Sequence, residues 1–296
     1  MSDSSSDSPV TGGPAFEECH WTSADGLRLY YRDYPGSSER PPLLCLHGLT
    51  RNSRDFEDFA ARHAGRFRVI AVDFRGRGNS DRDPQPQHYL PVTYAADILQ
   101  LLDLTAIPRA IFVGTSLGGL VTMLIAGMQP QRVEAAILND VGPDLDPRGV
   151  DRIKTYVGKP MRFANWDEAA AYVASINAGV PASFGDADWV RSARRLCREE
   201  DAAIVFDYDM AIADAFNQPE PAEPFDMWPL FDALARRPLL LVRGEESDLL
   251  STETAARMRD AGDEVAVATV SGVGHAPTLE EPEAVAAIDQ FLRRWD

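Results

Sequence analysis

Cysteines are scarce in this chain and none of them are close neighbours. Cys19, Cys45 and Cys197 are the only three, and no two of them form a C-x-x-C pair. An odd number of cysteines cannot all be bridged within one chain, and isolated cysteines are typical of proteins in a reducing compartment. We therefore expect free thiols and a cytoplasmic location.

Long apolar runs and an excess of basic residues are also missing. No run approaches the roughly 18 apolar residues that a membrane-spanning helix needs. The opening residues, MSDSSSDSPVTGG, lack the basic-then-apolar order of a secretory signal. The net charge of −17 at pH 7 opposes non-specific binding to nucleic acid or to an anionic membrane. We expect a soluble protein that binds neither, with residues 1–15 as a disordered tail.

The chain does contain a repeated alternation of apolar runs and helical patterns. An antiparallel hairpin is expected at residues 16–34, where Asp25-Gly26 tolerates a tight turn. Apolar runs typical of buried strands follow at residues 43–46, 67–73, 110–115, 133–139, 238–243 and 265–270. Helical spacing occurs at residues 53–63, 92–104, 117–128, 252–261 and 282–294. This alternation predicts an α/β protein with a mostly parallel sheet and helices on both faces.

One stretch breaks the alternation. Residues 143–225 carry helical patterns interrupted by prolines and glycines, with several aromatics and no convincing strand. A chain of 296 residues is long enough for one large domain that carries a smaller insertion. We predict a core domain formed by residues 16–142 and 226–296, with a helical insertion at residues 143–225.

A serine at the end of one predicted strand has the setting of a nucleophile. Gly114-Thr115-Ser116-Leu117-Gly118 has the G-x-S-x-G form, at the point where the strand at 110–115 turns into a helix. The string alone is weak, because at average glycine usage it arises by chance in about one chain in ten of this length. The setting adds weight, since such a turn projects the serine hydroxyl above the sheet. We predict that Ser116 is a nucleophile; the alternative is a helix N-cap.

A serine nucleophile needs a base, and His275 is the best-placed histidine. A serine hydroxyl is a poor nucleophile near neutral pH unless a base lies within hydrogen-bond reach and a third group orients that base. His275 lies in a loop directly after the last predicted strand, whereas His20, His63 and His88 have no comparable position. Sites of parallel sheets form at the carboxyl ends of strands. We therefore predict that His275 is the base.

Several acids compete to orient His275. Asp248 follows the strand at 238–243 and stands between the serine and the histidine in chain order. Asp140, at the end of the strand at 133–139, fits the same order, and Glu245 and Glu246 lie close by. The loop before the histidine's strand fits the order Ser, Asp, His better. We therefore predict Asp248, with Asp140 as the alternative.

A turn after the first parallel strand is suited to stabilising negative charge. His47-Gly48-Leu49 follows the strand at 43–46. Preorganised backbone N–H groups stabilise a tetrahedral oxyanion, and a helix start aims N–H groups at such a site. We predict that the N–H groups of Leu49 and Leu117 form the oxyanion hole, and that His47 buttresses the turn.

These motifs together resemble the α/β-hydrolase superfamily over nearly the whole chain, from about residue 16 to the end. The matching segments are His47-Gly48, the loop DFRGRGNS at residues 73–80, GTSLGG at 114–119, and the SD and GHAP segments that contain Asp248 and His275. The resemblance implies an eight-stranded core, a helical cap over the pocket and the same triad, with no metal or organic cofactor. It is also similar to a branch that includes esterases, enol-lactonases and hydrolases of ring-cleavage diketones.

One arginine, and two tryptophans in and just after the insertion, are candidates for substrate contacts. Arg51, just past the oxyanion turn, is a candidate for contacting a substrate carboxylate, although a solvent-facing side chain is the favoured interpretation. Trp166 and Trp228 are candidates to line an apolar pocket. In the resembling family the loop with Arg75 and Arg77 is structural; the alternative is that these arginines bind an anionic substrate.

The predicted activity is hydrolysis of a small-molecule ester or lactone, of the carboxylesterase or lactonase class (EC 3.1.1), through an acyl-enzyme on Ser116. One alternative is a carbon–carbon bond hydrolase that uses the same triad on a diketone. A second alternative is a receptor of the same fold that binds a small ligand without turnover.

Overall fold

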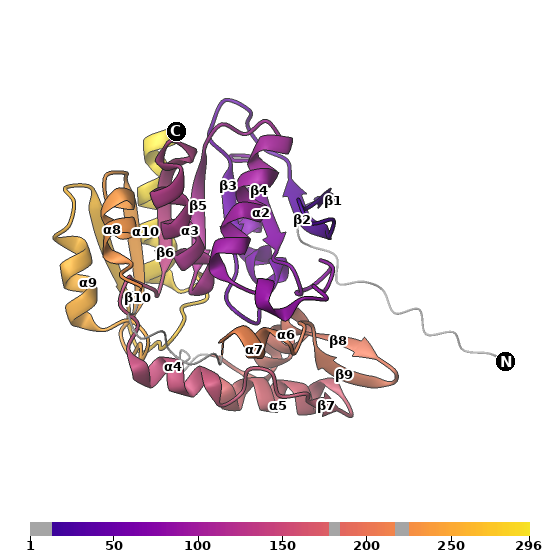
Figure 1. Ribbon diagram of the computed structural model, residues 1–296. Coiled ribbons are helices and arrows are strands. Elements are labelled where there is room, and N and C mark those ends of the chain that lie inside the picture. The colour runs from indigo at the N-terminus through magenta and orange to yellow at the C-terminus, as the bar shows by residue number, and fades with distance from the viewer. Residues whose placement is uncertain (1–13, 178–183, 217–224) are drawn as a thin grey trace.

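The computed structural model describes residues 14–177, 184–216 and 225–296, and its core is an eight-stranded sheet (Figure 1). The strand order is β1-β2-β4-β3-β5-β6-β10-β11. The strands are β1 (Glu17–Thr22), β2 (Arg28–Tyr34), β3 (Leu43–Leu46), β4 (Val69–Asp73), β5 (Ala110–Thr115), β6 (Val133–Asn139), β10 (Leu239–Gly244) and β11 (Val265–Val270). Strands β1 and β2 are antiparallel and all pairs from β4 to β11 are parallel. The predicted α/β fold is confirmed.

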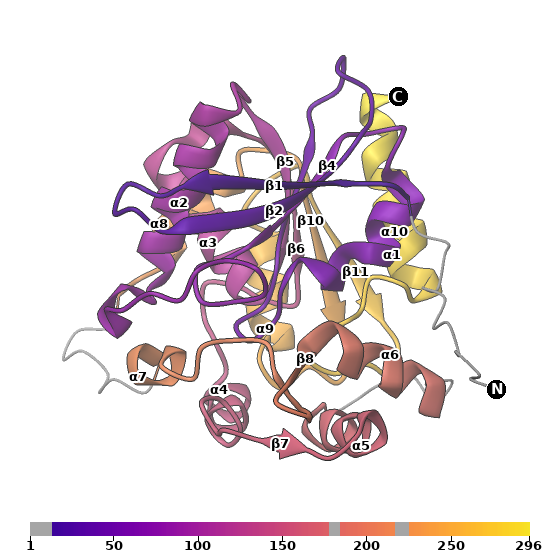
Figure 2. The ribbon, with the colours of Figure 1, turned by 90° about the vertical axis from the view of Figure 1, so that its right-hand side faces the viewer.

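Helices cover both faces of this sheet, which is why its central strands are continuous apolar runs. Figure 2 shows α2, α3 and α8 on one side, and α1 and α10 on the other. Their bounds are α1 (Glu57–His63), α2 (Pro91–Leu104), α3 (Leu117–Met128), α8 (Trp228–Leu234), α9 (Thr252–Arg259) and α10 (Pro282–Leu292). Two separate apolar clusters result, one on each face of the sheet.

The segment between β6 and α8 lies across one end of the sheet (Figure 1). It contains α4 (Pro147–Lys154), α5 (Trp166–Ile176), α6 (Asp186–Leu196) and α7 (Ile212–Phe216). It also contains a small sheet of β7 (Arg162–Phe163), β9 (Ala203–Phe206) and β8 (Cys197–Glu200), so the expectation that this segment has no strand is wrong. The turn between β8 and β9 has no sequence signal, because Asp201 and Ala202 adopt positive φ there without the glycine that usually marks such a turn.

Hydrogen bonds join this segment to the core. The loop after β4 pairs with the end of β9, where the Gly78 N–H donates to the Asp207 carbonyl and the Asp209 N–H donates to the Gly76 carbonyl. The Arg54 guanidinium forms an ion pair with the Asp207 carboxylate. These contacts hold the insertion against the carboxyl ends of the parallel strands.

The predicted tail, residues 1–15, lies almost entirely outside the described residues. Within the described part of the chain, no helix is both long and apolar enough to cross a membrane.

Close backbone packing fixes α3 against the sheet. A Cβ atom at Gly118 would lie 2.0 Å from the carbonyl oxygen of Leu46 in β3, a distance that no real Cβ contact reaches. Because both partners are backbone, neither can move without shifting β3 or α3. The start of α3, and with it the position of Ser116, therefore depends on glycine at this position.

We expect Gly118→Ala to lower the free energy of unfolding by about 1–3 kcal/mol or more, the usual cost of overpacking a close-packed interior. Gly127→Ala, in the same helix, is the control, because its Cβ meets the flexible side chain of Leu230 instead of backbone and alanine favours the helix by about 1 kcal/mol. Urea unfolding measures both variants. Equal losses for the two would contradict the backbone-contact argument.

A carboxylate pair at the contact between α6 and the core is sensitive to pH. Arg195 of α6 forms an ion pair with Asp58 of α1, and its Nη1 lies 3.4 Å from Oε1 of Glu280. Burial, and then the hydrogen bond to Asp58, raise the pKa of Glu280 to about 7. Burial opposes ionisation of Asp58 too, but hydrogen bonds from Glu280 and Arg195 lower its pKa to about 2. Glu280 therefore keeps its proton in the folded state to higher pH than in the unfolded chain.

Because the pKa of Glu280 is raised in the folded state, its protonated carboxyl stabilises that state fully below about pH 4.5. This stabilisation is lost as the pH rises through about 7. Glu280→Gln keeps a neutral side chain at every pH, so we expect it to be more stable than wild type at pH 8 by about 1–2 kcal/mol, after discounting for partial exposure. The difference should shrink at pH 5. Urea unfolding at both pH values measures this effect, with exposed Glu283→Gln as the control; a gain independent of pH would contradict it.

Candidate active site

Ser116 occupies a strained turn between β5 and α3. Its φ is 51°, in the left-handed region that L-residues seldom adopt. Its N–H donates to the Asn139 carbonyl of neighbouring β6 at 3.0 Å, and α3 begins at Leu117. This conformation projects the hydroxyl over the carboxyl end of the sheet, as the G-x-S-x-G string predicts.

The imidazole of His275 bridges Ser116 and a buried carboxylate. His275 comes from the loop after β11, and its Nε2 lies 3.0 Å from the Ser116 Oγ. Its Nδ1 lies 2.8 Å from Oδ2 of Asp140. A proton on Nδ1 would be held by Asp140 and leave Nε2 free to accept the serine proton, which is the order that activates a serine hydroxyl.

Hydrogen bonds and burial hold the Asp140 carboxylate in one orientation. It directly follows β6 and is fully buried, with a φ of 55° that turns its side chain toward His275. Besides His275, its carboxylate accepts from the Gly244 N–H at 2.9 Å and from the Ser247 Oγ at 2.6 Å. These two donors leave little freedom for the carboxylate to rotate away from the imidazole.

Asp248 does not contact His275 in this structure, contrary to the sequence prediction. Its carboxylate instead accepts two hydrogen bonds from Arg152 of α4, with Nε–Oδ2 at 2.5 Å and Nη2–Oδ1 at 2.9 Å. The hydrogen bond from Arg152 lowers the pKa of Asp248. The position beside the imidazole belongs to Asp140, the alternative from the sequence, while Glu245 accepts from the Gly272 N–H at 2.9 Å.

The order of the strands explains why the sequence favoured an acid that does not hydrogen-bond His275 in the structure. Strands β6 and β10 are neighbours, so Asp140 and Asp248 both follow strands that end at the same edge of the sheet. Strand β6 also lies next to β5, which leads to Ser116. The one available signal was that Asp140 directly follows its strand, whereas Asp248 is separated from β10 by a loop. The Arg152 partner comes from 96 residues away and no local pattern reveals it.

His47 supports the turn that follows β3. Its Nδ1 lies 2.7 Å from the Gly48 carbonyl oxygen, and its Nε2 lies 3.1 Å from the Phe74 N–H. Burial lowers the pKa of His47 to about 3, so the ring is neutral, with Nδ1 donating and Nε2 accepting. Nε of buried Arg77 donates to the Leu49 carbonyl at 3.0 Å. His47 therefore contacts the turn as a buttress would, and Arg77, which the sequence did not point to, adds a second contact at Leu49.

The two predicted oxyanion donors belong to residues that line the same cavity as Ser116. Leu49 and Leu117 both line a cavity that reaches the Ser116 side chain. Leu117 is the first residue of α3, and the first N–H groups of a helix have no intrahelical acceptor. The Leu49 carbonyl points to Arg77. Both N–H groups remain candidates for the oxyanion hole.

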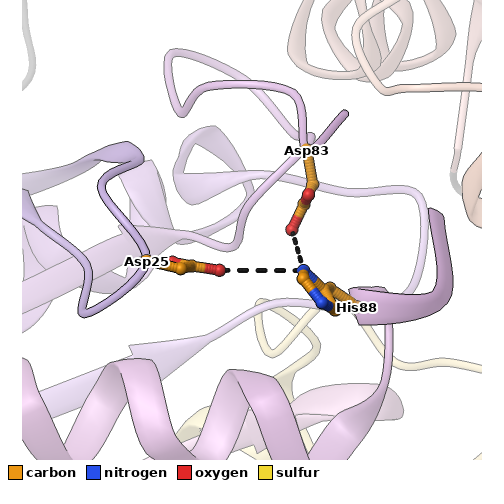
Figure 3. A group of neighbouring side chains, drawn as sticks. All are labelled: Asp25, Asp83 and His88. Atoms are coloured by element: carbon orange, nitrogen blue, oxygen red, sulfur yellow. Dashed lines mark hydrogen bonds and ion pairs between the residues drawn. The ribbon is translucent and has the colours of Figure 1, made fainter. Parts of the chain in front are cut away.

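Arg75 is the centre of a buried ion cluster away from this site. Its guanidinium contacts the carboxylates of Asp25, Asp83 and Asp97 at 2.6–2.7 Å. Figure 3 shows Asp25 and Asp83 facing His88, a grouping with the donor types of a metal site. Arg75 Nη1 already lies 2.7 Å and 2.6 Å from the same two carboxylate oxygens, and supplies the positive charge that a metal ion would bring.

Arg75 and Arg77 are therefore engaged by the protein itself, and the alternative that they bind an anionic substrate is not supported. Both side chains are almost fully buried. Besides Leu49, Arg77 donates to the Arg75 carbonyl at 2.8 Å and to the Tyr94 hydroxyl at 2.9 Å. The loop is structural.

Two cavities meet at Ser116. One is polar, with an empty volume of about 910 Å³ including its mouth, and among its lining residues are Arg51, Tyr156, Asn177 and His275. The other has about 800 Å³ and is lined mainly by apolar side chains.

The predicted tryptophan contacts are not found at these cavities. The Trp166 Nε1–H donates to Glu199 at 3.2 Å and its ring packs under Arg194. The Trp228 Nε1–H donates to Asp144 at 2.7 Å and its ring packs under Arg257. Neither tryptophan lines the polar or the apolar cavity, because both are occupied in packing and hydrogen bonds elsewhere.

Known proteins resemble this chain over nearly its full length. The model of the Alpha/beta hydrolase family matches residues 43–288. A 3-hydroxybutyrate-oligomer hydrolase of Cupriavidus necator is 36% identical, with 94% of this chain and 96% of that protein covered. A 2-(acetamidomethylene)succinate hydrolase of Mesorhizobium japonicum is 31% identical, with 85% and 88% covered. A crystal structure of an alpha/beta hydrolase from Novosphingobium aromaticivorans has a TM-score of 0.90 and 49% identity, covering 96% of this chain and 100% of that one.

The contacts of the two aspartates predict different effects on the reactivity of Ser116. We expect Asp140→Asn to slow covalent labelling of Ser116 by a fluorophosphonate by about 10⁴-fold, the scale reported for loss of the acid in a serine protease triad. Asp248→Asn should slow it far less, because Asp248 contacts Arg152 and not His275. Mass spectrometry measures the labelling rate.

Circular dichroism must show that both variants are folded, since Asp140 is fully buried. A large loss of reactivity in Asp248→Asn together with a small one in Asp140→Asn would reverse the assignment.

Proposed function

Since the chain belongs to the alpha/beta hydrolase family, we propose that it is a serine hydrolase that cleaves carboxylic esters of small molecules. The observation that carries this proposal is the line of hydrogen bonds from Ser116 through His275 to Asp140. Each contact is at hydrogen-bond distance, and the line ends in a carboxylate held by two further donors. Such a line is what a serine hydroxyl needs to attack a carbonyl near neutral pH.

The proposed reaction has two half-reactions. The Ser116 Oγ attacks the ester carbonyl carbon while its proton passes to Nε2 of His275, and Asp140 holds the resulting imidazolium. The N–H groups of Leu49 and Leu117 stabilise the negative carbonyl oxygen. The bond to the alkoxy oxygen then breaks, and that oxygen takes the proton from His275. Water attacks the acyl-enzyme in the same way and releases the carboxylic acid.

The role of the orienting acid is assigned to Asp140 in this proposal. Asp248 has a different task, which is to hold α4 of the insertion against the core through Arg152. We propose that residues 143–225 act as a cap over the pocket. Ile153, Tyr156 and Asn177 of this segment line the polar cavity, so the position of α4 affects the shape of the substrate site.

An oligoester of a hydroxy acid is the substrate class that the similarities favour. The relative from Cupriavidus necator, which covers nearly the whole chain, is named for hydrolysis of 3-hydroxybutyrate oligomers. Lactones are internal esters and would react by the same steps. The esters, and oligoesters of hydroxy acids among them, are therefore the first substrates to test.

We expect Ser116→Ala to abolish hydrolysis of p-nitrophenyl butyrate, because it removes the hydroxyl that lies 3.0 Å from Nε2 of His275. Its melting temperature should remain close to that of wild type, since alanine keeps the Cβ and the backbone conformation. Release of p-nitrophenol measures the activity. Ser175→Ala is the control, as this exposed serine donates to the Tyr172 carbonyl within α5. Turnover by Ser116→Ala near the wild-type rate would refute the proposed nucleophile.

A further inference from the structure

Resting on the proposed function, we propose that the substrate is an ester of a hydroxy acid that keeps a free carboxylate. Its carboxylate binds Arg51 in the polar cavity and its acyl chain lies in the apolar cavity. Cleavage then releases the carboxylate-bearing hydroxy acid as the leaving alcohol. For an oligoester, this orientation removes one unit from the end that carries the free carboxylate.

The two cavities differ in chemistry and share the nucleophile. Ser116, Leu49 and Ile153 line both of them. The apolar cavity is bounded by side chains from the core and from the insertion, which are Leu49, Tyr89, Leu90, Pro91, Tyr94, Leu117, Leu120, Val141, Leu145, Val150, Ile153, Ile212 and Leu249. An ester bound with its carbonyl at Ser116 would therefore extend one half into a polar space and the other into an apolar one.

The position of His275 decides which half of the ester lies in which cavity. His275 lines the polar cavity and not the apolar one. The leaving oxygen must receive its proton from Nε2 of His275, so the alcohol half lies on the polar side. Leu117, whose N–H would face the carbonyl oxygen, lines the apolar cavity. With the alcohol half on the polar side, the acyl half is left the apolar cavity, which Ser116 also lines.

Arg51 is the cation in the polar cavity that has capacity for a further partner. Its Nη2 donates to Oδ1 of Asn177 at 3.1 Å, and its Nη1 lies 3.6 Å from Oδ1 of Asp55, beyond a direct hydrogen bond. The side chain is 32% exposed. A guanidinium has five N–H donors in a planar fork that suits a carboxylate, and these two contacts use few of them within the described part of the chain.

Arg195, the other arginine that lines the polar cavity, is already engaged. Asp58, Glu57 and Glu280 surround its guanidinium. A substrate carboxylate would have to displace one of these carboxylates, whereas at Arg51 the one carboxylate paired with it among the described residues is Asp55, at 3.6 Å. The geometry therefore assigns the carboxylate to Arg51.

The reaction balances as R–CO–O–R′ + H₂O → R–COOH + HO–R′, where R′ carries the carboxylate. The bond from the acyl carbon to the R′ oxygen breaks, and that oxygen takes the proton that Ser116 gave to His275. Water then supplies the hydroxyl of R–COOH and restores the proton of Ser116. No oxidant, reductant or further reactant takes part.

The test compares two substrates that differ in charge and by one methyl group. They are the butyryl ester of 3-hydroxybutyrate, with its carboxylate free, and the methyl ester of the same compound. Wild type, Arg51→Gln, Arg51→Lys and Arg109→Gln are compared by kcat/KM, with butyrate release followed by chromatography. Arg109 is a matched control because it is exposed and pairs with Glu134 on the surface. Salt at about 0.15 M screens the long-range repulsion from the acidic chain.

We expect wild type to prefer the free acid over the methyl ester by about 10- to 100-fold in kcat/KM, the usual effect of a charge-assisted hydrogen bond. Arg51→Gln should bring this ratio to about one, Arg51→Lys should keep part of the preference, and Arg109→Gln should keep all of it. A wild-type ratio of one or less overturns the proposal without any variant. A preference that survives in folded Arg51→Gln also overturns it.

Hydrolysis of p-nitrophenyl butyrate by wild type and Ser116→Ala, run in parallel, distinguishes failure of the carboxylate site at Arg51 from failure of the proposed serine hydrolase. Turnover that depends on Ser116, without preference for the free acid, refutes only the carboxylate site at Arg51. Turnover that is absent, or that does not depend on Ser116, refutes the proposed serine hydrolase itself.

Discussion

The turn at Ser116 is the constraint on which the site depends. A residue at a φ of 51° persists only where the surrounding structure holds it. Here the holding elements are the close contact of Gly118 with β3 and the hydrogen bond from the Ser116 N–H to β6. Both are backbone contacts, and they join the segment around Ser116 to β3 and β6. The geometry of the nucleophile is therefore set by the core of the sheet and not by a surface loop.

Two aspartates at one edge of the sheet have separate tasks. Asp140 follows β6 and bonds His275, and Asp248 follows β10 and bonds Arg152 of the insertion. Since the two strands are neighbours, either loop can bring an acid toward the imidazole, and the one that does so is free of a competing cation. Asp248, bound at both oxygens by Arg152, connects the position of α4 to the loop beside the triad.

Buried charges shape the rest of the site in an acidic protein. Arg75, in the loop after β4, forms ion pairs with Asp25, Asp83 and Asp97, and the same loop carries Arg77 to the carbonyl of Leu49. Removing one member of such a buried set leaves uncompensated charge, which is why these contacts hold the oxyanion turn firmly. Arg51 differs, because it is partly exposed and lines the polar cavity.

Local sequence patterns predicted those features of this protein that depend on residues close together in the chain. The apolar runs identified the strands of the core, and the serine between glycines at a strand end, with the histidine after the last strand, identified two of the three residues in the hydrogen-bonded line. The hairpin at Asp201-Ala202 was missed, because its positive φ values are imposed by strand pairing without a glycine. Only the tertiary structure decided which acid contacts His275, which carboxylates surround Arg195, and where Trp166 and Trp228 lie. Each depends on a partner distant in sequence, such as Arg152 for Asp248, and the order of strands that brings such partners together leaves no trace in a local pattern of residues.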